Sequence, residues 1–358
     1  MNQTKIIITL SIVCAILVVA LMSYFLFQYF RPTEESAPSE KKEADRVDDP
    51  ESTIYMSADG GETWRGISGA RFPVTFITAE RGRSRFLIGA ADEGMWQLDA
   101  EEFDQVEELS ESLRVFDADV RMRSQDAYLA LETEGRGYVM KLVGTEFKEL
   151  FFAPLESSPV RAVATDPFAA DTIYAGAGTA LYISEDDGDT WRTLHQFRKK
   201  IQDVHVHPHI AGWYLVTTES GDMFRSSDYG GSWEDISRGF SKFKDARKNQ
   251  QVRVDPVTNT FYLTSDYGLL RSLDNAATWQ EVPLLVPPDS LPILGFAVHP
   301  AKPHVLYVSA ASQLYKSEDG GRTWSGSLFS EKGTIRVITF SPSPPYYLLL
   351  GFSPPSRF

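Results

Sequence analysis

Two carboxylates separated by one residue, Asp117 and Asp119, come closest to a hydrolytic pair in this chain. A glycoside hydrolase needs two carboxyl groups that face each other across the scissile bond. Nothing in the sequence singles out a partner for either aspartate. No histidine or cysteine cluster lies nearby to suggest a metal site, and neither a phosphate-binding glycine loop nor a nucleophile elbow occurs. The sequence therefore predicts no catalytic residue, no metal and no cofactor.

Two basic segments depart from the acidic background of the chain, whose formal net charge is −14. The first is Arg198-Lys199-Lys200, and the second, residues 238–251, carries further lysines and arginines with phenylalanines between them. Exposed cations either attract an anionic partner or are simply solvated. We expect a protein or an anionic polymer as the partner, and no nucleic acid. The candidate binding residues are Arg198, Lys199, Lys200, Phe240, Lys242, Phe243, Lys244, Arg247 and Lys248.

The elements that position these residues follow from an eight-residue pattern, Ser-x-Asp-x-Gly-x-Thr-Trp, which occurs five times with minor changes. Aspartate and glycine favour tight turns, and serine and aspartate side chains bond nearby backbone N–H groups. The tryptophan then begins the next strand and buries a large ring. A turn repeated in every unit indicates a folding device rather than catalytic acids or calcium ligands. Its defining residues are Ser57, Asp59, Trp64, Ser184, Asp186, Trp191, Ser226, Asp228, Trp233, Ser272, Asp274, Trp279, Ser317, Asp319 and Trp324.

The spacing of these patterns predicts the number of structural units. The tryptophans that end the last four copies of the pattern lie 42, 46 and 45 residues apart. This is the length of a four-stranded propeller blade. Phe103 and Phe147 substitute for the tryptophan in two degenerate units, so seven aromatic residues mark seven blades. The strand-like runs 335–340 and 346–352 can complete the blade begun by residues 52–70. We predict an all-β fold, a single seven-bladed β-propeller over residues 52–358 with a closing blade shared by both ends of the chain.

The eight-residue pattern resembles the Asp-box, or BNR repeat, of β-propellers such as sialidases and sortilin-type receptors. Sialidases carry an early Phe-Arg-Ile-Pro-like motif, for which Ala70-Arg71-Phe72-Pro73 is a poor substitute. The chain also resembles xyloglucanase-type hydrolases, which usually place paired carboxylates between two propellers, whereas one is predicted here. A further resemblance is to the photosystem II assembly and stability factors, which are non-catalytic propellers with an arginine patch. Arg161, Arg253 and Arg336 recur near the starts of inner strands here.

These resemblances imply two functions from different classes. The first is a non-catalytic recognition or assembly module that binds a protein or anionic partner through the loop face of a monomeric propeller. The alternative is a sialidase- or xyloglucanase-like glycoside hydrolase that acts on extracellular glycans. Propellers bind partners where loops join the outer strand of one blade to the inner strand of the next. The two basic segments are such loops in successive blades, so we expect them to be neighbours.

The residues before the propeller predict a membrane attachment. After a flank of residues 1–5, residues 6–30 form an uncharged and mostly apolar run, long enough to span a bilayer of ~30 Å as a helix. A cleaved signal peptide is the alternative, but cleavage after Ala20 would leave residues 21–30 as an apolar mature end. Residues 31–51 predict a disordered acidic linker. The flanking lysines and arginines do not favour an outside propeller. The resemblance implies one, so we expect a single-pass cell-membrane protein with an extracytoplasmic propeller.

The anchor hypothesis predicts that membranes washed in alkaline carbonate retain the full chain, because an apolar helix of this length partitions into the bilayer core. Amino-terminal sequencing of the retained protein should begin at or near Met1. A soluble protein that begins within residues 18–35 would instead show that the apolar run is a cleaved signal peptide.

Overall fold

The computed structural model describes residues 49, 51–80, 84–91, 93–100, 107–110, 113–121, 124, 126–154, 158–284, 291–328 and 333–353. The expected anchor at residues 6–30 lies outside the described residues, as do residues 31–48 of the expected linker. Within the ranges just given, no helix is long and apolar enough to cross a membrane. Regular structure there consists of β-strands and one 3-10 turn, η2 (Ser237–Phe240).

The strands form seven antiparallel four-stranded sheets, which we number as blades 1 to 7. Blade 1 contains β3 (Phe76–Ala79), β4 (Arg85–Gly89), β5 (Met95–Asp99) and β6 (Glu107–Ser110). Blade 2 contains β7 (Arg114–Val120), β8 (Ala127–Thr133), β9 (Arg136–Val143) and β10 (Glu146–Phe152). Blade 3 contains β11 (Val160–Thr165), β12 (Ile173–Ala177), β13 (Ala180–Ser184) and β14 (Arg192–Gln196).

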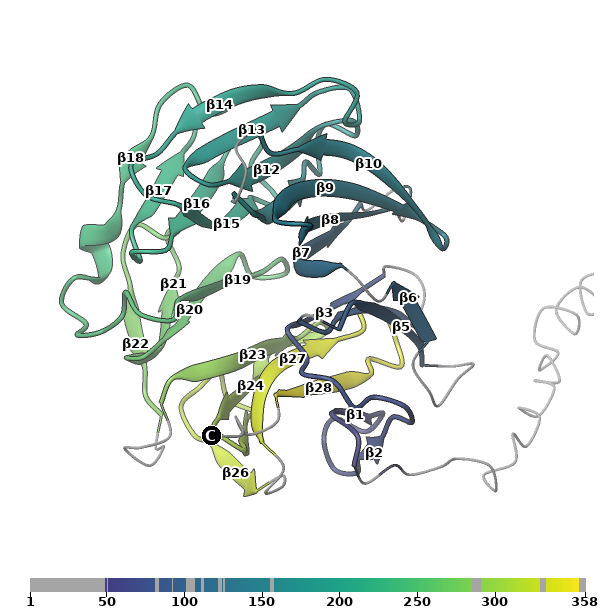
Figure 1. Ribbon diagram of the computed structural model, residues 1–358. Helices are drawn as coiled ribbons and strands as arrows, with labels where there is room; N and C mark the ends of the chain where they lie inside the picture. Colours follow the sequence, from purple (N-terminus) through teal and green to yellow (C-terminus); the bar gives the residue numbers. More distant parts are fainter. Residues whose placement is uncertain are drawn as a thin grey trace, which may run out of the picture. The chain divides into compact units, whose positions relative to one another are not determined.

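The remaining blades continue around the ring in chain order (Figure 1). Blade 4 contains β15 (Ile201–Val206), β16 (Tyr214–Thr218), β17 (Met223–Ser226) and β18 (Glu234–Asp235). Blade 5 contains β19 (Gln251–Asp255), β20 (Thr260–Ser265), β21 (Gly268–Ser272) and β22 (Gln280–Val282). Blade 6 contains β23 (Ile293–His299), β24 (Lys302–Ala310), β25 (Gln313–Ser317) and β26 (Ser325–Leu328). Blade 7 contains β27 (Thr334–Phe340), β28 (Leu348–Ser353), β1 (Ile54–Ser57) and β2 (Arg65–Gly66).

Blade 7 closes the ring with strands from both ends of the propeller, as the sequence predicted. Strand β28 pairs antiparallel with β1, so that Tyr55 lies opposite Leu350, and Figure 1 shows the two strands side by side. Because every blade then packs between two neighbours, the ring has no open end with unpaired strand edges. The seven-bladed count is confirmed. Phe147 lies in the outer strand β10 as expected, whereas Phe103 falls outside the described residues.

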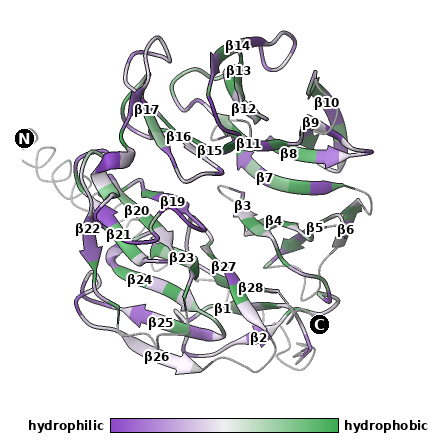
Figure 2. Cartoon of the chain, turned by 60° about the vertical axis from the view of Figure 1, so that its left-hand side comes forward, coloured by the Kyte–Doolittle hydropathy of each residue, from purple (hydrophilic) through white to green (hydrophobic). Residues whose placement is uncertain are grey.

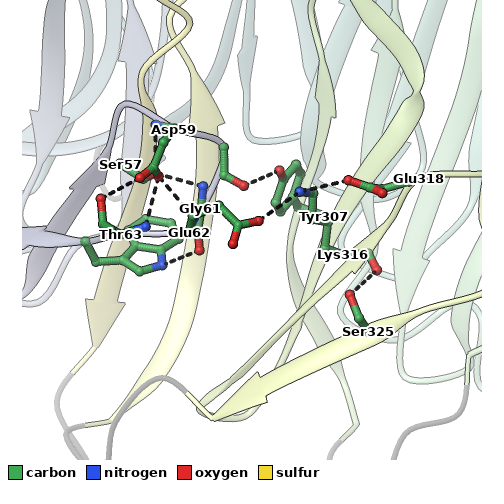
Figure 3. Close-up of polar contacts among 11 residues, drawn as sticks. Ser57, Asp59, Gly61, Glu62, Thr63, Tyr307, Lys316, Glu318 and Ser325 are labelled. Carbon is green, nitrogen blue, oxygen red and sulfur yellow. Dashed lines mark hydrogen bonds and ion pairs between the residues drawn. The ribbon is translucent and has the colours of Figure 1, made fainter.

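The five octapeptides fold into one repeated hairpin between the third and outer strands (Figure 3 shows the first). Ser57 Oγ donates to Asp59 Oδ1 at 2.7 Å and accepts the Gly61 N–H at 2.8 Å, while Asp59 Oδ1 accepts the Thr63 N–H at 2.9 Å. The other four copies repeat these bonds. Burial raises the pKa of Asp59, but the bonds from Thr63 and Ser57 outweigh it and lower the pKa to about 2. A carboxylate occupied in this way holds a turn together.

The tryptophan that ends each octapeptide contacts the preceding blade. Trp191 Nε1 donates to the Leu150 carbonyl of blade 2 at 3.1 Å, and Trp324 Nε1 donates to the Pro283 carbonyl that follows blade 5 at 2.9 Å. The expectation that these rings are fully buried is wrong for Trp191, Trp233 and Trp324, which are half-buried. They lie at the blade edge, where one side of the ring faces solvent. Only Trp279 among the five is fully buried.

The core lies between adjacent blades and is built mainly from their second strands. Every residue of β12, β16 and β20 is buried, and hydrophobic colour runs along the middle strands of the blades in Figure 2. Buried polar contacts also cross between blades, since Tyr174 of blade 3 donates its hydroxyl to that of Tyr214 in blade 4 at 2.6 Å. The blades therefore form a rigid ring around a central channel.

Replacing Trp279 with alanine should lower the free energy of unfolding by ~3–5 kcal/mol, because a large ring is removed from a packed site. Trp279→Phe should be far milder, since the buried indole N–H has no hydrogen-bond partner among the described residues. Trp324→Ala should cost less than Trp279→Ala, because its ring is half exposed. Urea unfolding of the three variants measures the loss in free energy of unfolding for each. Equal losses in the three variants would contradict the prediction.

Candidate functional site

The loop-face end of the channel is shaped by a repeated irregularity in the inner strands. Five of the seven inner strands shift register against their second strand at the same place near their start. Such a bulge re-aims a side chain that regular pairing would place otherwise. All five bulged residues line one cavity of about 260 Å³. These residues are Phe116, Arg161, Gln202, Leu294 and Arg336.

Three arginines from blades 3, 5 and 7 line this cavity, namely Arg161, Arg253 and Arg336. The guanidinium of Arg161 lies 4.6 Å from the ring centroid of Phe116, and Arg253 donates to the Val252 carbonyl at 3.0 Å. All three side chains are exposed. Among the described residues, none of them forms an ion pair with a carboxylate. The cavity therefore presents guanidinium groups that a ligand can reach.

Two carboxyl groups, Asp117 of blade 2 and Asp203 of blade 4, line the same cavity. Burial, together with the charge of Asp203, raises the pKa of Asp117 to about 7. Burial also raises the pKa of Asp203, but His205 and Arg253 outweigh it and hold the pKa below its usual value. His205 Nε2 lies 3.2 Å from Asp203 Oδ2, within ion-pair distance but not aligned for a hydrogen bond. Near neutral pH, Asp203 is ionised while Asp117 is partly protonated.

The structure separates the two aspartates that the sequence singled out. Asp117 Oδ2 accepts the Val163 N–H at 3.0 Å and remains at the cavity. Asp119 Oδ2 accepts both the Thr165 N–H at 2.7 Å and the Thr165 hydroxyl at 2.8 Å, which ties blade 2 to blade 3. Asp203, and not Asp119, shares the arginine-lined cavity with Asp117. A second cavity of about 310 Å³ is lined by all three aspartates. The sequence analysis did not identify Asp203, because it belongs to another blade. Asp117 and Asp203 nevertheless occupy equivalent positions, since each directly follows the bulged residue of its inner strand.

The two basic loops pack against the hairpin between β16 and β17 of blade 4. The Glu219 N–H donates to the Lys200 carbonyl at 2.9 Å, and Arg247 forms an ion pair with Asp222. Lys248 pairs with Asp245 at 2.9 Å. All seven candidate cations are exposed on this face, namely Arg198, Lys199, Lys200, Lys242, Lys244, Arg247 and Lys248. Whether they bind a partner stays a prediction.

One of the two candidate phenylalanines cannot contact a partner. Phe240 is fully buried, because η2 turns its ring into the core beside Trp279. The prediction that Phe240 is a binding residue is therefore wrong. Phe243 is half-buried, with its ring centroid 5.0 Å from that of Tyr267 and Lys242 Nζ 4.9 Å above it. Sequence spacing alone could not distinguish the two rings.

The fold and channel define a class, a seven-bladed β-propeller structurally similar to GH74 xyloglucanases and to YCF48. A GH74 xyloglucanase from Xanthomonas campestris superimposes with a TM-score of 0.65 and 18% identity, over 79% of this chain and 51% of that chain. YCF48, solved bound to a D1 peptide, gives a TM-score of 0.59 and 16% identity, over 79% of this chain and 94% of that chain. Identities this low establish the fold alone.

A relative found by sequence is also a xyloglucanase. A xyloglucanase from Hypocrea jecorina (strain QM6a) is 35% identical over 141 residues, which cover 37% of this chain. The matched region spans 16% of the length of that curated enzyme, and the chain spans about half of the GH74 structure from Xanthomonas. No protein-family model matches the chain.

The raised pKa of Asp117 predicts a pH-dependent stability. Between the usual pKa of 3.8 and about 7, the folded chain holds a proton that the unfolded chain has released, so the free energy of unfolding falls as pH rises. Asp117→Asn should remove this slope, because an amide oxygen still accepts the Val163 N–H without ionising. Urea unfolding of both proteins between roughly pH 5 and pH 8 measures the difference. Parallel profiles would show that Asp117 titrates normally.

Proposed function

We propose that the protein is a non-catalytic recognition propeller, tethered to the cell membrane, that binds an anionic group of a protein partner at the loop-face mouth of its channel. The observation that carries this proposal is the convergence of Arg161, Arg253 and Arg336 on one cavity in an acidic protein. Guanidinium groups bind carboxylates in a two-point, charge-assisted geometry. A carboxylate is therefore the anion that we propose.

The charge of the cavity depends on the protonation of Asp117. When Asp117 is protonated, the three arginines are opposed by the single charge of Asp203, which is itself paired with His205. The cavity is then positive. Ionisation of Asp117 above its pKa of about 7 offsets part of this charge. Carboxylate binding should consequently strengthen as the pH falls through neutrality.

The basic loops would attract the anionic partner before it contacts the cavity. Exposed cations steer an anionic partner over a range set by the Debye length of ~8 Å at physiological ionic strength. Arg198, Lys199 and Lys200 are exposed and form no ion pair among the described residues, so their charges are available for steering. The structural similarity to YCF48, which was solved with a bound D1 peptide, supports a polypeptide as the carrier of the anionic group.

Glycoside hydrolysis is the second candidate, favoured by one specific observation. Asp117 and Asp203 share a cavity and have pKa values moved in opposite directions. A retaining or inverting hydrolase needs one protonated and one ionised carboxyl group. In this candidate Asp117 would be the general acid, and Asp203 the nucleophile or base. The resemblance to xyloglucanases supports a plant-type β-glucan as the substrate to test first.

The recognition proposal predicts that a short peptide with a free terminal carboxylate binds more tightly than the same peptide with a terminal amide. The double variant Arg161→Gln/Arg336→Gln should weaken the carboxylate form by roughly tenfold or more, as expected for the loss of charge-assisted bonds. Arg192→Gln is the matched control, because Arg192 is exposed on the outer strand β14 and pairs with Glu185. Calorimetric titration measures the affinity of the wild type for both peptides and the affinity of each variant for the carboxylate peptide.

Two results separate the candidates. Equal binding of the carboxylate and amide peptides would reject the recognition proposal at this cavity. Release of oligosaccharides from xyloglucan by the wild type, lost in both Asp117→Asn and Asp203→Asn, would replace it with the hydrolase. Asp117→Asn should not alter folding at acidic pH, since Asp117 is already uncharged there and asparagine preserves the shape of the side chain.

A further inference from the structure

The face of the propeller opposite the channel mouth exposes a group of large apolar side chains. This turn face is formed by the turns after the inner strands and by the octapeptide hairpins. Six of the seven large hydrophobic side chains that are exposed in the described residues lie on it, and five of these six belong to blades 3, 4 and 5. These five are Phe168, Ile210, Tyr229, Val257 and Leu273, with exposed fractions of 47%, 40%, 65%, 62% and 67%. The other two belong to blade 2, where Val143 ends β9 at the turn face and Phe152 ends β10 at the opposite end of the blade.

Contacts between the turns show that these side chains share one surface. The His209 ring bonds the Pro256 carbonyl, which joins the turn that carries Ile210 to the turn that carries Val257. The Tyr229 N–H donates to the Gly212 carbonyl at 3.0 Å, which holds the octapeptide hairpin of blade 4 against the turn of the same blade. His207 Nε2 lies 3.3 Å from Asn275 Oδ1, in the hairpin that carries Leu273. We call this surface the apolar turn patch.

The backbone segments that surround the apolar turn patch contain more acidic than basic side chains, although Arg121 and Lys141 pair with Asp187 and Arg192 pairs with Glu185. They are residues 166–172, 185–191, 207–213, 227–233, 255–259 and 273–279. These segments contain nine aspartates and glutamates, two histidines, and no lysine or arginine. Hydrogen bonds within the hairpins lower the pKa of Asp186, Asp228 and Asp274, so their charge persists below neutral pH. The turns of blade 6 differ, because Lys302 and Arg322 lie there.

We propose that the apolar turn patch binds a polypeptide segment in which lysine or arginine side chains flank apolar ones. Apolar side chains of such a segment would cover Ile210, Val257 and Leu273, and its cations would approach the surrounding carboxylates. Exposed contiguous apolar surface with a charged border is typical of protein interaction sites. This face lies opposite the channel mouth, so the proposal is independent of the carboxylate site.

Charge decides among the possible occupants. An anionic bilayer would be repelled by the surrounding carboxylates, and burial of a carboxylate against lipid headgroups would be costly. A second copy of this chain has a net charge of −14, which opposes self-association through an acidic face. A basic, partly apolar segment satisfies both the apolar contacts and the charge.

The test uses a fluorescein-labelled peptide of alternating lysine and leucine, with the glutamate–leucine peptide as its counterpart. Fluorescence anisotropy measures their binding to the propeller and to the variant Val257→Ser/Leu273→Ser. The control variant is Phe152→Ser, which removes an exposed apolar side chain at the opposite end of blade 2. All substitutions leave the net charge unchanged, so general attraction of a cationic peptide to an acidic protein is the same in each.

We expect the lysine peptide to bind the wild type and the control alike, and the patch variant roughly tenfold more weakly. The glutamate peptide should not bind. Failure of the lysine peptide to bind, or equal binding by all three proteins, would overturn the proposal. If the wild type sediments as a dimer that the patch variant abolishes, the occupant is a second copy. Loss of binding to anionic phosphatidylglycerol vesicles in the patch variant alone would instead identify a lipid surface, and either result would overturn the proposed partner.

Discussion

The pairing of β28 with β1 is the interaction on which the rest of the structure depends. It joins strands that lie nearly the full length of the propeller apart in the sequence, and it turns a row of blades into a ring. Once the ring is closed, all seven inner strands must start at one face and end at the other. The bulged residues of five strands then meet in one cavity, although they come from blades far apart in sequence. The candidate site is thus a consequence of closure.

Closure also explains how two half-buried carboxyl groups are tolerated in one cavity. Asp117 would be costly to bury unpaired, and it responds with a raised pKa and with hydrogen bonds from the backbone N–H groups of Val163 and Ala118. Asp203 instead stays charged beside His205 and Arg253. The same rigid ring therefore supports two titration states in one cavity. In the recognition proposal, this separation would make the binding of an anion depend on pH.

The fold was predictable from the sequence because its signals are local and repeated. The octapeptide encodes a turn through bonds that span four residues, and its spacing encodes the blade. The candidate site was only partly predictable. The three arginines and Asp117 could be noticed near the starts of inner strands, but the bulges that aim them depend on pairing between strands. The pairing of Asp117 with Asp203, rather than Asp119, depends on which blades face each other across the channel. Burial of Phe240 depends in the same way on η2 and on the ring of Trp279.

The two faces of the propeller differ in the chemistry they present, and the difference follows from how each is built. The loop face is made of connections between blades, whose lengths and charges can vary, and it holds the arginines and the basic loops. The turn face is made of octapeptide hairpins that need aspartate in every copy, so it is acidic by construction. Exposed apolar side chains at Tyr229 and Leu273 occupy positions that the hairpin bonds leave free to vary. The side chains at these two positions make none of the hairpin bonds, so their apolar character supports the proposed partner.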